Sequence, residues 1–122
     1  MQTRRQIQLA MTGLLAIALL GGSIAIAQDT IRKEPVRFKA GESTATVKGT
    51  LKGDDTVDYI LNARAGQSMV VTLECKNKSA YFNVLPPGSD SAIFIGSTLG
   101  DRFEGELPKH GDYAIRVYLM RN

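Results

Sequence analysis

The 122-residue sequence has few of the side chains that most enzymes use for catalysis. It contains one cysteine, Cys75, and one histidine, His110, so it can form neither an internal disulfide nor a cluster of Cys and His ligands. His110 lies in a Pro-Lys-His-Gly-Asp segment that is typical of an exposed turn. A G-x-S-x-G motif is absent, and the carboxylates of Asp54, Asp55 and Asp58 lack the spacing of a calcium-binding loop. We therefore predict no enzymatic activity, no metal and no cofactor.

A hydrophobic period of about 3.6 residues, which would predict helices, is also missing, whereas a period of two recurs along the chain. The alternating runs are separated by Gly-, Pro- and Asp-rich turns at spacings of about 8–12 residues. This pattern predicts an all-β fold, either a small antiparallel β-sandwich or a barrel. Cys75 falls on the apolar side of its run and is predicted to be buried. The runs cover residues 44–52, 57–63, 69–75, 81–85, 92–95, 102–107 and 113–119.

The first 27 residues have the pattern of a cleavable export signal. Arg4 and Arg5 precede an apolar core at Leu14–Leu20, which is shorter than the roughly 20 residues that a spanning helix needs. Ala25-Ile26-Ala27 supplies a small-x-small cleavage site, so the mature chain is predicted to begin at Gln28. An uncleaved membrane anchor is the alternative. We expect a periplasmic protein with no stable membrane insertion after cleavage.

The expected mature segment is nearly neutral and has the length of one domain. Two of the 15 Lys and Arg residues lie in the leader, so the remaining 13 almost balance the 12 Asp and Glu residues, for a net charge of about +1. This balance predicts no nucleic-acid partner. The expected organisation is a signal peptide at 1–27, a loose N-terminal lead at 28–35 and a single β domain at 36–122.

The clearest alternation, at residues 113–119, lies three residues before the last residue, Asn122. A strand at an open sheet edge would expose unpaired backbone groups. We expect that an earlier strand covers it or that the natural protein continues with a closing strand. A second copy could supply that strand instead, which would give a homodimer.

Two features favour binding over catalysis. A Pro-Pro-Gly-Ser-Asp loop at 86–90 lies near Tyr81, Phe82 and Phe94 in the sequence, although these residues suit a core and a tight turn equally well. Arg116 and Tyr118 are predicted to share the outward face of the last strand, where a guanidinium could bind carboxylates. The alternative for this second feature is an ordinary solvated strand face.

Several segments resemble one known family. They are TVKGTLKG at 46–53, Tyr59 followed by ARAGQ at 63–67, LPPGSD at 85–90, and GDYAIRV at 111–117 followed by Arg121-Asn122. Together they are similar to the periplasmic inhibitors of g-type lysozyme. The ARAGQ and GDYAIRV segments also resemble β-sandwich modules appended to secreted peptidases. The resemblance implies a β-sandwich or barrel that blocks the substrate cleft of the lysozyme without catalysis.

The resemblance also implies roles for particular residues. Arg121 would pair with acidic groups of the cleft, Asn122 would shape its loop, and Arg116 and Tyr118 would flank it. Two departures predict weak or no inhibition. Asp54 stands where the family has an aromatic residue, and the family continues past R-N with a second arginine and a closing strand. The alternatives are a non-enzymatic periplasmic module that binds a glycan or protein, and an envelope protein without a specific ligand.

Overall fold

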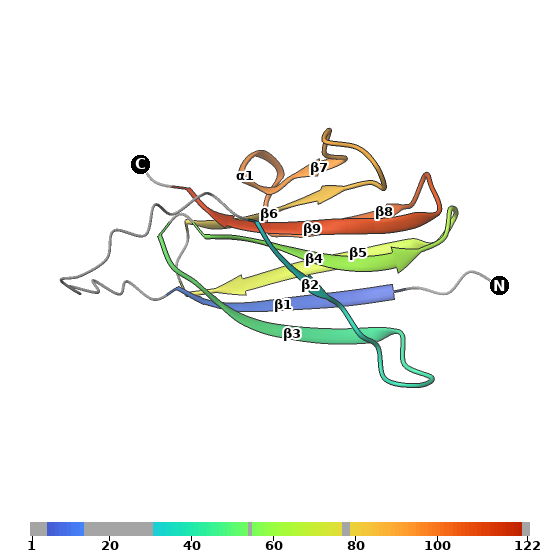
Figure 1. Ribbon diagram of the computed structural model, residues 1–122, viewed down its shortest axis with the longest axis horizontal. Coiled ribbons are helices and arrows are strands. Elements are labelled where there is room, and N and C mark those ends of the chain that lie inside the picture. Colours follow the sequence, from blue (N-terminus) through green and yellow to red (C-terminus); the bar gives the residue numbers. More distant parts are fainter. Residues whose placement is uncertain (1–4, 14–30, 54, 77–78, 121–122) are drawn as a thin grey trace.

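The chain folds into two β-sheets that pack face to face (Figure 1). The computed structural model describes residues 5–13, 31–53, 55–76 and 79–120. In these ranges the elements are β1 (Arg5–Gly13), β2 (Arg32–Pro35), β3 (Thr44–Leu51), β4 (Thr56–Ala63), β5 (Ser68–Cys75), β6 (Ala80–Leu85), β7 (Phe94–Ile95), α1 (Gly96–Leu99), β8 (Arg102–Glu106) and β9 (Gly111–Leu119).

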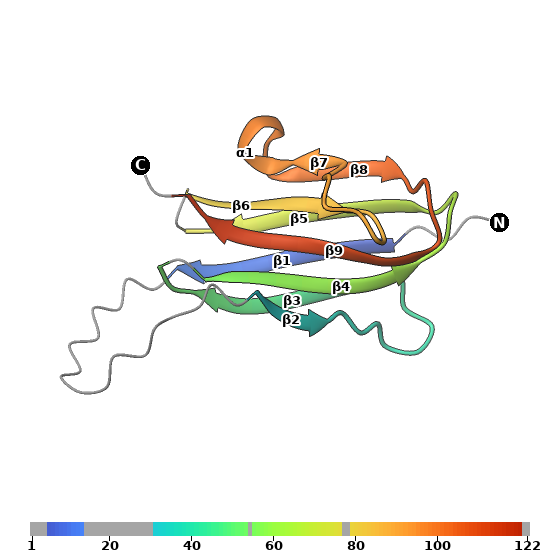
Figure 2. The ribbon, with the colours of Figure 1, turned by 45° about the horizontal axis from the view of Figure 1, so that its top comes forward.

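The strand order is β3-β1-β5-β8 in one sheet and β2-β4-β9-β6-β7 in the other (Figure 2). The predicted all-β class and the sandwich are confirmed, whereas the barrel is wrong because the two sheets do not join into one closed sheet. The antiparallel prediction needs correction, since β1 runs parallel to both β3 and β5, and β2 runs parallel to β4. The last strand is not at an edge: β9 lies between β4 and β6.

The two-residue alternation of the sequence places apolar side chains between the sheets. In β9, Tyr113, Ile115 and Val117 are fully buried, and they lie opposite inward-facing residues of β4. The core is completed by apolar side chains from both sheets: Ile7, Leu9, Leu51, Val57, Tyr59, Leu61, Ala63, Met69, Val71, Leu73, Ala80, Phe82, Val84, Phe94 and Leu107. The register is fixed, because a shift by one residue would turn every apolar side chain of β9 outward.

Several local predictions differ from the structure. Arg5–Gly13, within the predicted leader, forms β1, and the last four residues of the predicted loose lead form β2. The one-turn helix α1 was missed, because four residues are too few to show a helical period. Cys75 is only partly buried, although its side chain packs against the core. Among the described residues, no helix has the length and apolar character needed to cross a membrane.

The buried phenol of Tyr59 should make the folded chain less stable at alkaline pH. Burial, with the negative charge of Glu34 as a second cause, raises its pKa above the usual value of 10.0. Above pH 10 the unfolded chain loses this proton while the folded chain retains it, so stability falls as the pH rises through the raised pKa. We expect the urea midpoint to decrease above pH 10, and to decrease less in Tyr59→Phe. Tyr81→Phe, on the outer face, is the control and should keep the wild-type slope.

Candidate functional site

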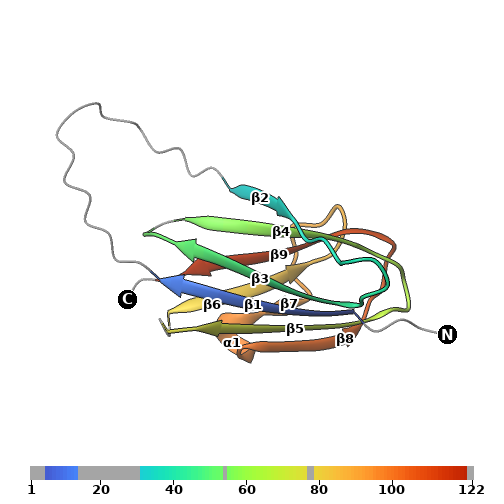
Figure 3. The same ribbon diagram turned by 90° about the horizontal axis from the view of Figure 1, so that it is seen from below.

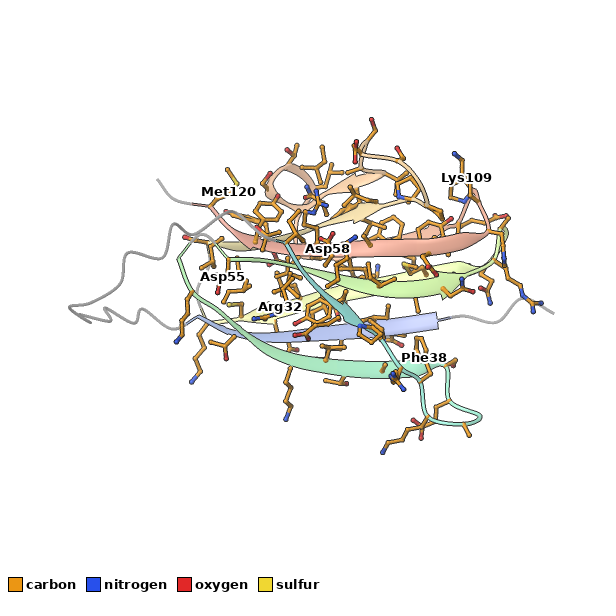
Figure 4. All side chains as sticks on the ribbon, in the orientation of Figure 1. Arg32, Phe38, Asp55, Asp58, Lys109 and Met120 are labelled. Atoms are coloured by element: carbon orange, nitrogen blue, oxygen red, sulfur yellow. The ribbon has the colours of Figure 1, made fainter. Side chains whose placement is uncertain are left out.

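Three chain segments that are distant in sequence meet at one end of the sandwich. Thr56, at the start of β4, pairs with Tyr118, and Ala80, at the start of β6, pairs with Leu119. The Met120 N–H donates to the Ser79 carbonyl oxygen at 2.9 Å, which fixes the backbone just beyond β9. Figure 4 shows Met120 and Asp55 at this end and Lys109 at the opposite end. The β3–β4 turn, the start of β6 and the exit from β9 therefore form one surface, which we call the exit end.

The β3–β4 turn is held in place by its own hydrogen bonds. The Asp55 N–H donates to the Lys52 carbonyl oxygen at 2.9 Å, and the Lys52 N–H donates to Asp55 Oδ2 at 3.3 Å. Gly53 has a φ of 53°, a left-handed conformation that glycine adopts without steric cost. Three predicted site residues, Asp54, Arg121 and Asn122, lie outside the described residues. Their described neighbours in sequence belong to the exit end.

On the outer face of the β4-β9-β6 sheet, Arg116 forms a bidentate ion pair with Asp58. Arg116 Nε donates to Asp58 Oδ1 at 2.8 Å, and Arg116 Nη2 donates to Oδ2 at 3.0 Å. The Asp58 side chain is only 4% exposed, whereas that of Arg116 is 32% exposed. The hydrogen bond to Asp58 raises the pKa of Arg116 above its usual value. The guanidinium is therefore already paired within the chain.

Tyr118 is held on the same face by Asn83 of β6. The Tyr118 hydroxyl donates to Asn83 Oδ1 at 2.9 Å, and the Gly96 N–H donates to the same oxygen at 3.2 Å. The Tyr118 ring also contacts Tyr81, with ring centroids 6.2 Å apart. One side-chain oxygen of Asn83 thereby connects Tyr118, on the outer face of β9, to Gly96, the first residue of α1.

The structure brings together only part of what the sequence suggested. Arg116 and Tyr118 do share the outward face of β9, as predicted. Phe82 and Phe94 contact each other in the core with ring centroids 5.0 Å apart, so the core alternative is confirmed for these two residues, whereas Tyr81 lies on the outer face beside Tyr118. His110 is exposed in the turn before β9. In the part of the chain that the structure describes, no three His, Cys, Asp or Glu side chains are grouped to hold a metal ion.

Asp58 and Asn83 are the two outer-face residues that sequence reasoning missed as partners. Each is a polar residue with an apolar neighbour on both sides in its strand, which was the available signal. Their partners could not be named, because the Asp58–Arg116 contact joins residues 58 positions apart.

Comparison with known proteins agrees with this architecture. No family model matches the chain. The inhibitor of g-type lysozyme from Escherichia coli (strain K12) is 30% identical over 90 residues, which are 71% of this chain and 66% of that protein. The crystal structure of Aeromonas hydrophila PliG, a periplasmic lysozyme inhibitor of g-type lysozyme, has a TM-score of 0.70 and 39% identity, covering 77% of this chain and 84% of that one.

The chain belongs to the family of periplasmic g-type lysozyme inhibitors. The family prediction and the periplasmic location are thereby confirmed. The chain spans 66% of the length of the curated inhibitor that it matches, just under two thirds. In the sequence, the Arg121-Asn122 motif follows Met120, the last described residue of the exit end.

The Arg116–Asp58 pair predicts a large effect on stability. Removing the guanidinium leaves the buried Asp58 carboxylate without its counter-charge, so Arg116→Ala should lower the free energy of unfolding by about 3 kcal/mol. Urea denaturation followed by circular dichroism measures this change. Arg102→Ala is the control, because its ion pair with Glu104 is exposed and should contribute about 0.5 kcal/mol or less. Equal stability of the two variants would contradict a structural role for Arg116.

Proposed function

We propose that this chain inhibits a g-type lysozyme by placing its exit end in the substrate cleft of the enzyme. The observation that carries the proposal is the family membership, because a periplasmic inhibitor that is 39% identical in sequence has the same fold as this chain. Inhibition would be steric and electrostatic, without catalysis by this chain. The enzyme partner is a protein with acidic groups in its active site, because hydrolysis of a glycosidic bond uses carboxylic acids.

Arg121 is the residue that we propose to contact those acidic groups. It follows a backbone that is fixed as far as Met120, because β9 is paired on both sides and the Met120 N–H is bonded to Ser79. A short tether to a rigid strand lowers the entropy lost when the side chain is ordered on binding. An arginine can also form two parallel hydrogen bonds with a carboxylate. Asn122 would shape the backbone beside it.

In this proposal Arg116 and Tyr118 support the contact with the enzyme and do not make its central interaction. The guanidinium of Arg116 is engaged by Asp58, so it is poorly placed to bind an acidic group of the partner. Tyr118 is fixed by Asn83, and its backbone pairs with both neighbouring strands. We infer that both residues flank the contact and hold β9 in register, while Arg121 reaches the enzyme.

The role of Arg121 predicts a selective loss of binding. Arg121→Ala should weaken inhibition by about 30-fold or more, since the loss of one partner of a buried charge pair typically costs at least 2 kcal/mol. Its unfolding midpoint should stay at the wild-type value. A lysis assay with g-type lysozyme measures inhibition, and c-type lysozyme tests the specificity.

Arg64→Ala is the matched control for this experiment. Arg64 is exposed in the β4–β5 turn, at the end of the sandwich opposite to the exit end, and its loss removes the same charge (Figure 1). Inhibition by Arg64→Ala should equal that of the wild type. An equal loss in both variants would indicate that general charge matters rather than the position of Arg121. If the folded wild type fails to inhibit, the chain is a binding module for another ligand.

Asp54 should oppose binding, because it follows Gly53 of the β3–β4 turn in the sequence, and a carboxylate would be repelled by an acidic cleft that receives this turn. Replacing it by the isosteric amide, in Asp54→Asn, should strengthen inhibition by about five-fold. This factor corresponds to the repulsion of about 1 kcal/mol between two close like charges in water. The gain should decrease as salt is added. Glu106→Gln, at the far end of β8, removes the same charge and should leave inhibition unchanged. Weaker inhibition by Asp54→Asn would contradict this proposal.

A further inference from the structure

The large apolar side chains that are exposed in the described part of the chain are grouped rather than scattered. They are Ile93, Ile95, Leu99 and Met120, with exposed fractions of 39%, 44%, 64% and 45%. Three of them come from the short segment of β7 and α1, and the fourth is the last described residue of the exit end. Single apolar side chains on a surface are common, whereas a group of them marks a site of interaction.

The segment that carries three of these side chains has no charged residue. Residues 91–100 have the sequence SAIFIGSTLG, although charged residues make up 22% of the whole chain. The centre of a protein–protein interface is depleted in charged residues in the same way, and methionine is enriched there. The composition of the segment therefore suits contact with another protein better than contact with water.

The backbone of this segment is held firmly against the strands beneath it. The Gly96 N–H donates to Asn83 Oδ1 at 3.2 Å, and just beyond α1 the Asp101 carbonyl oxygen accepts from the Leu73 N–H at 3.0 Å. Gly96 lies so close to β6 that a Cβ atom at this position would collide with the carbonyl oxygen of Phe82. The exposed side chains are thus presented by a fixed backbone, which reduces the entropy lost on binding.

The segment also lies beside the exit end. Ile95 pairs with Asn83 in antiparallel β6, so the chain beyond Ile95 runs back towards Ala80, the first residue of β6. Figures 1 and 3 both show α1 towards the end of the sandwich at which β9 ends. Ile95, Leu99 and Met120 therefore form one surface, which we call the apolar patch. Its strands β6, β7 and β9 all follow the predicted leader in the sequence.

We propose that the apolar patch is a second contact surface for the g-type lysozyme, beside the contact made by Arg121. The inference rests on the proposed function and extends it. One arginine covers a small part of the roughly 800 Å² per partner that a stable interface buries, so the exit end needs neighbouring surface. Apolar contacts around an ion pair also exclude water, which lowers the local dielectric constant and strengthens the pair. The matching surface on the enzyme is apolar and borders its cleft.

A second copy of the chain is a poorer occupant of the apolar patch. Oligomers of two identical chains usually have two-fold symmetry, so the same patch would face itself. Arg121 follows Met120 directly in the sequence, and such a contact would bring two arginines towards each other. Their like charges would oppose the contact. An enzyme with acidic groups in its cleft offers the opposite charge at this position.

The test is to measure the binding of the exported protein to g-type lysozyme by biolayer interferometry, together with the lysis assay. Leu99→Ser should raise the dissociation constant about ten-fold, mainly through faster dissociation, because it removes the most exposed side chain of the patch. Ile95→Thr should raise it about three-fold, since a smaller apolar area is lost. The unfolding midpoints of both variants should equal that of the wild type. Ile93→Thr is the matched control, because Ile93 has a similar exposure but precedes Ile95 and lies further from the exit end.

The outcomes separate this inference from the proposed function. If the wild type binds the lysozyme and both patch variants bind equally well, the inference is overturned and the proposed function stands. If the folded wild type does not bind, both are overturned. An equal loss in Ile93→Thr and Leu99→Ser would show that the position of the apolar side chain does not matter, which also contradicts the inference. Analytical ultracentrifugation tests the second copy: a wild-type dimer that Leu99→Ser converts into a monomer would assign the patch to self-association instead.

Discussion

The position of β9 in the interior of its sheet is the constraint on which the remaining features depend. Its three inward side chains, Tyr113, Ile115 and Val117, are fully buried, so the strand cannot slip by one residue without exposing them. This register places Arg116 opposite Asp58 and brings Met120 to Ser79. The same packing that forms the core thereby fixes where the strand ends and where the R-N motif begins.

The outer face of this sheet shows how a residue suited to recognition can instead serve the fold. The sequence alone suggests that an arginine on an outward strand face is free to bind a partner. The structure pairs it with a carboxylate that is almost completely buried, and the buried charge makes the pair costly to break. Asn83 plays a comparable part for Tyr118 and also accepts the first N–H of α1. The outer face is therefore a supporting layer for the exit end.

The two sheets differ in their dependence on the N-terminal segment. The sheet that contains β9 is formed by strands after residue 31, whereas the other sheet holds β3 through β1. A change in β1 therefore acts first on the sheet that does not contain β9. The exit end nevertheless includes the β3–β4 turn. A shift of β3 would therefore move this turn, whose Lys52 and Asp55 are hydrogen-bonded to each other.

The strand class, the positions of most strands and the inward face of β9 follow from the amino-acid order alone. These features are local, because alternation between neighbouring residues decides which side of a strand is buried. The family resemblance was also carried by contiguous segments of the sequence. Three other features are visible only in the folded chain: β1 joins a sheet, three strand pairings are parallel, and Arg116 binds Asp58. Those features join residues that are far apart in the chain, and their partners follow from the register of whole strands, which no local pattern specifies.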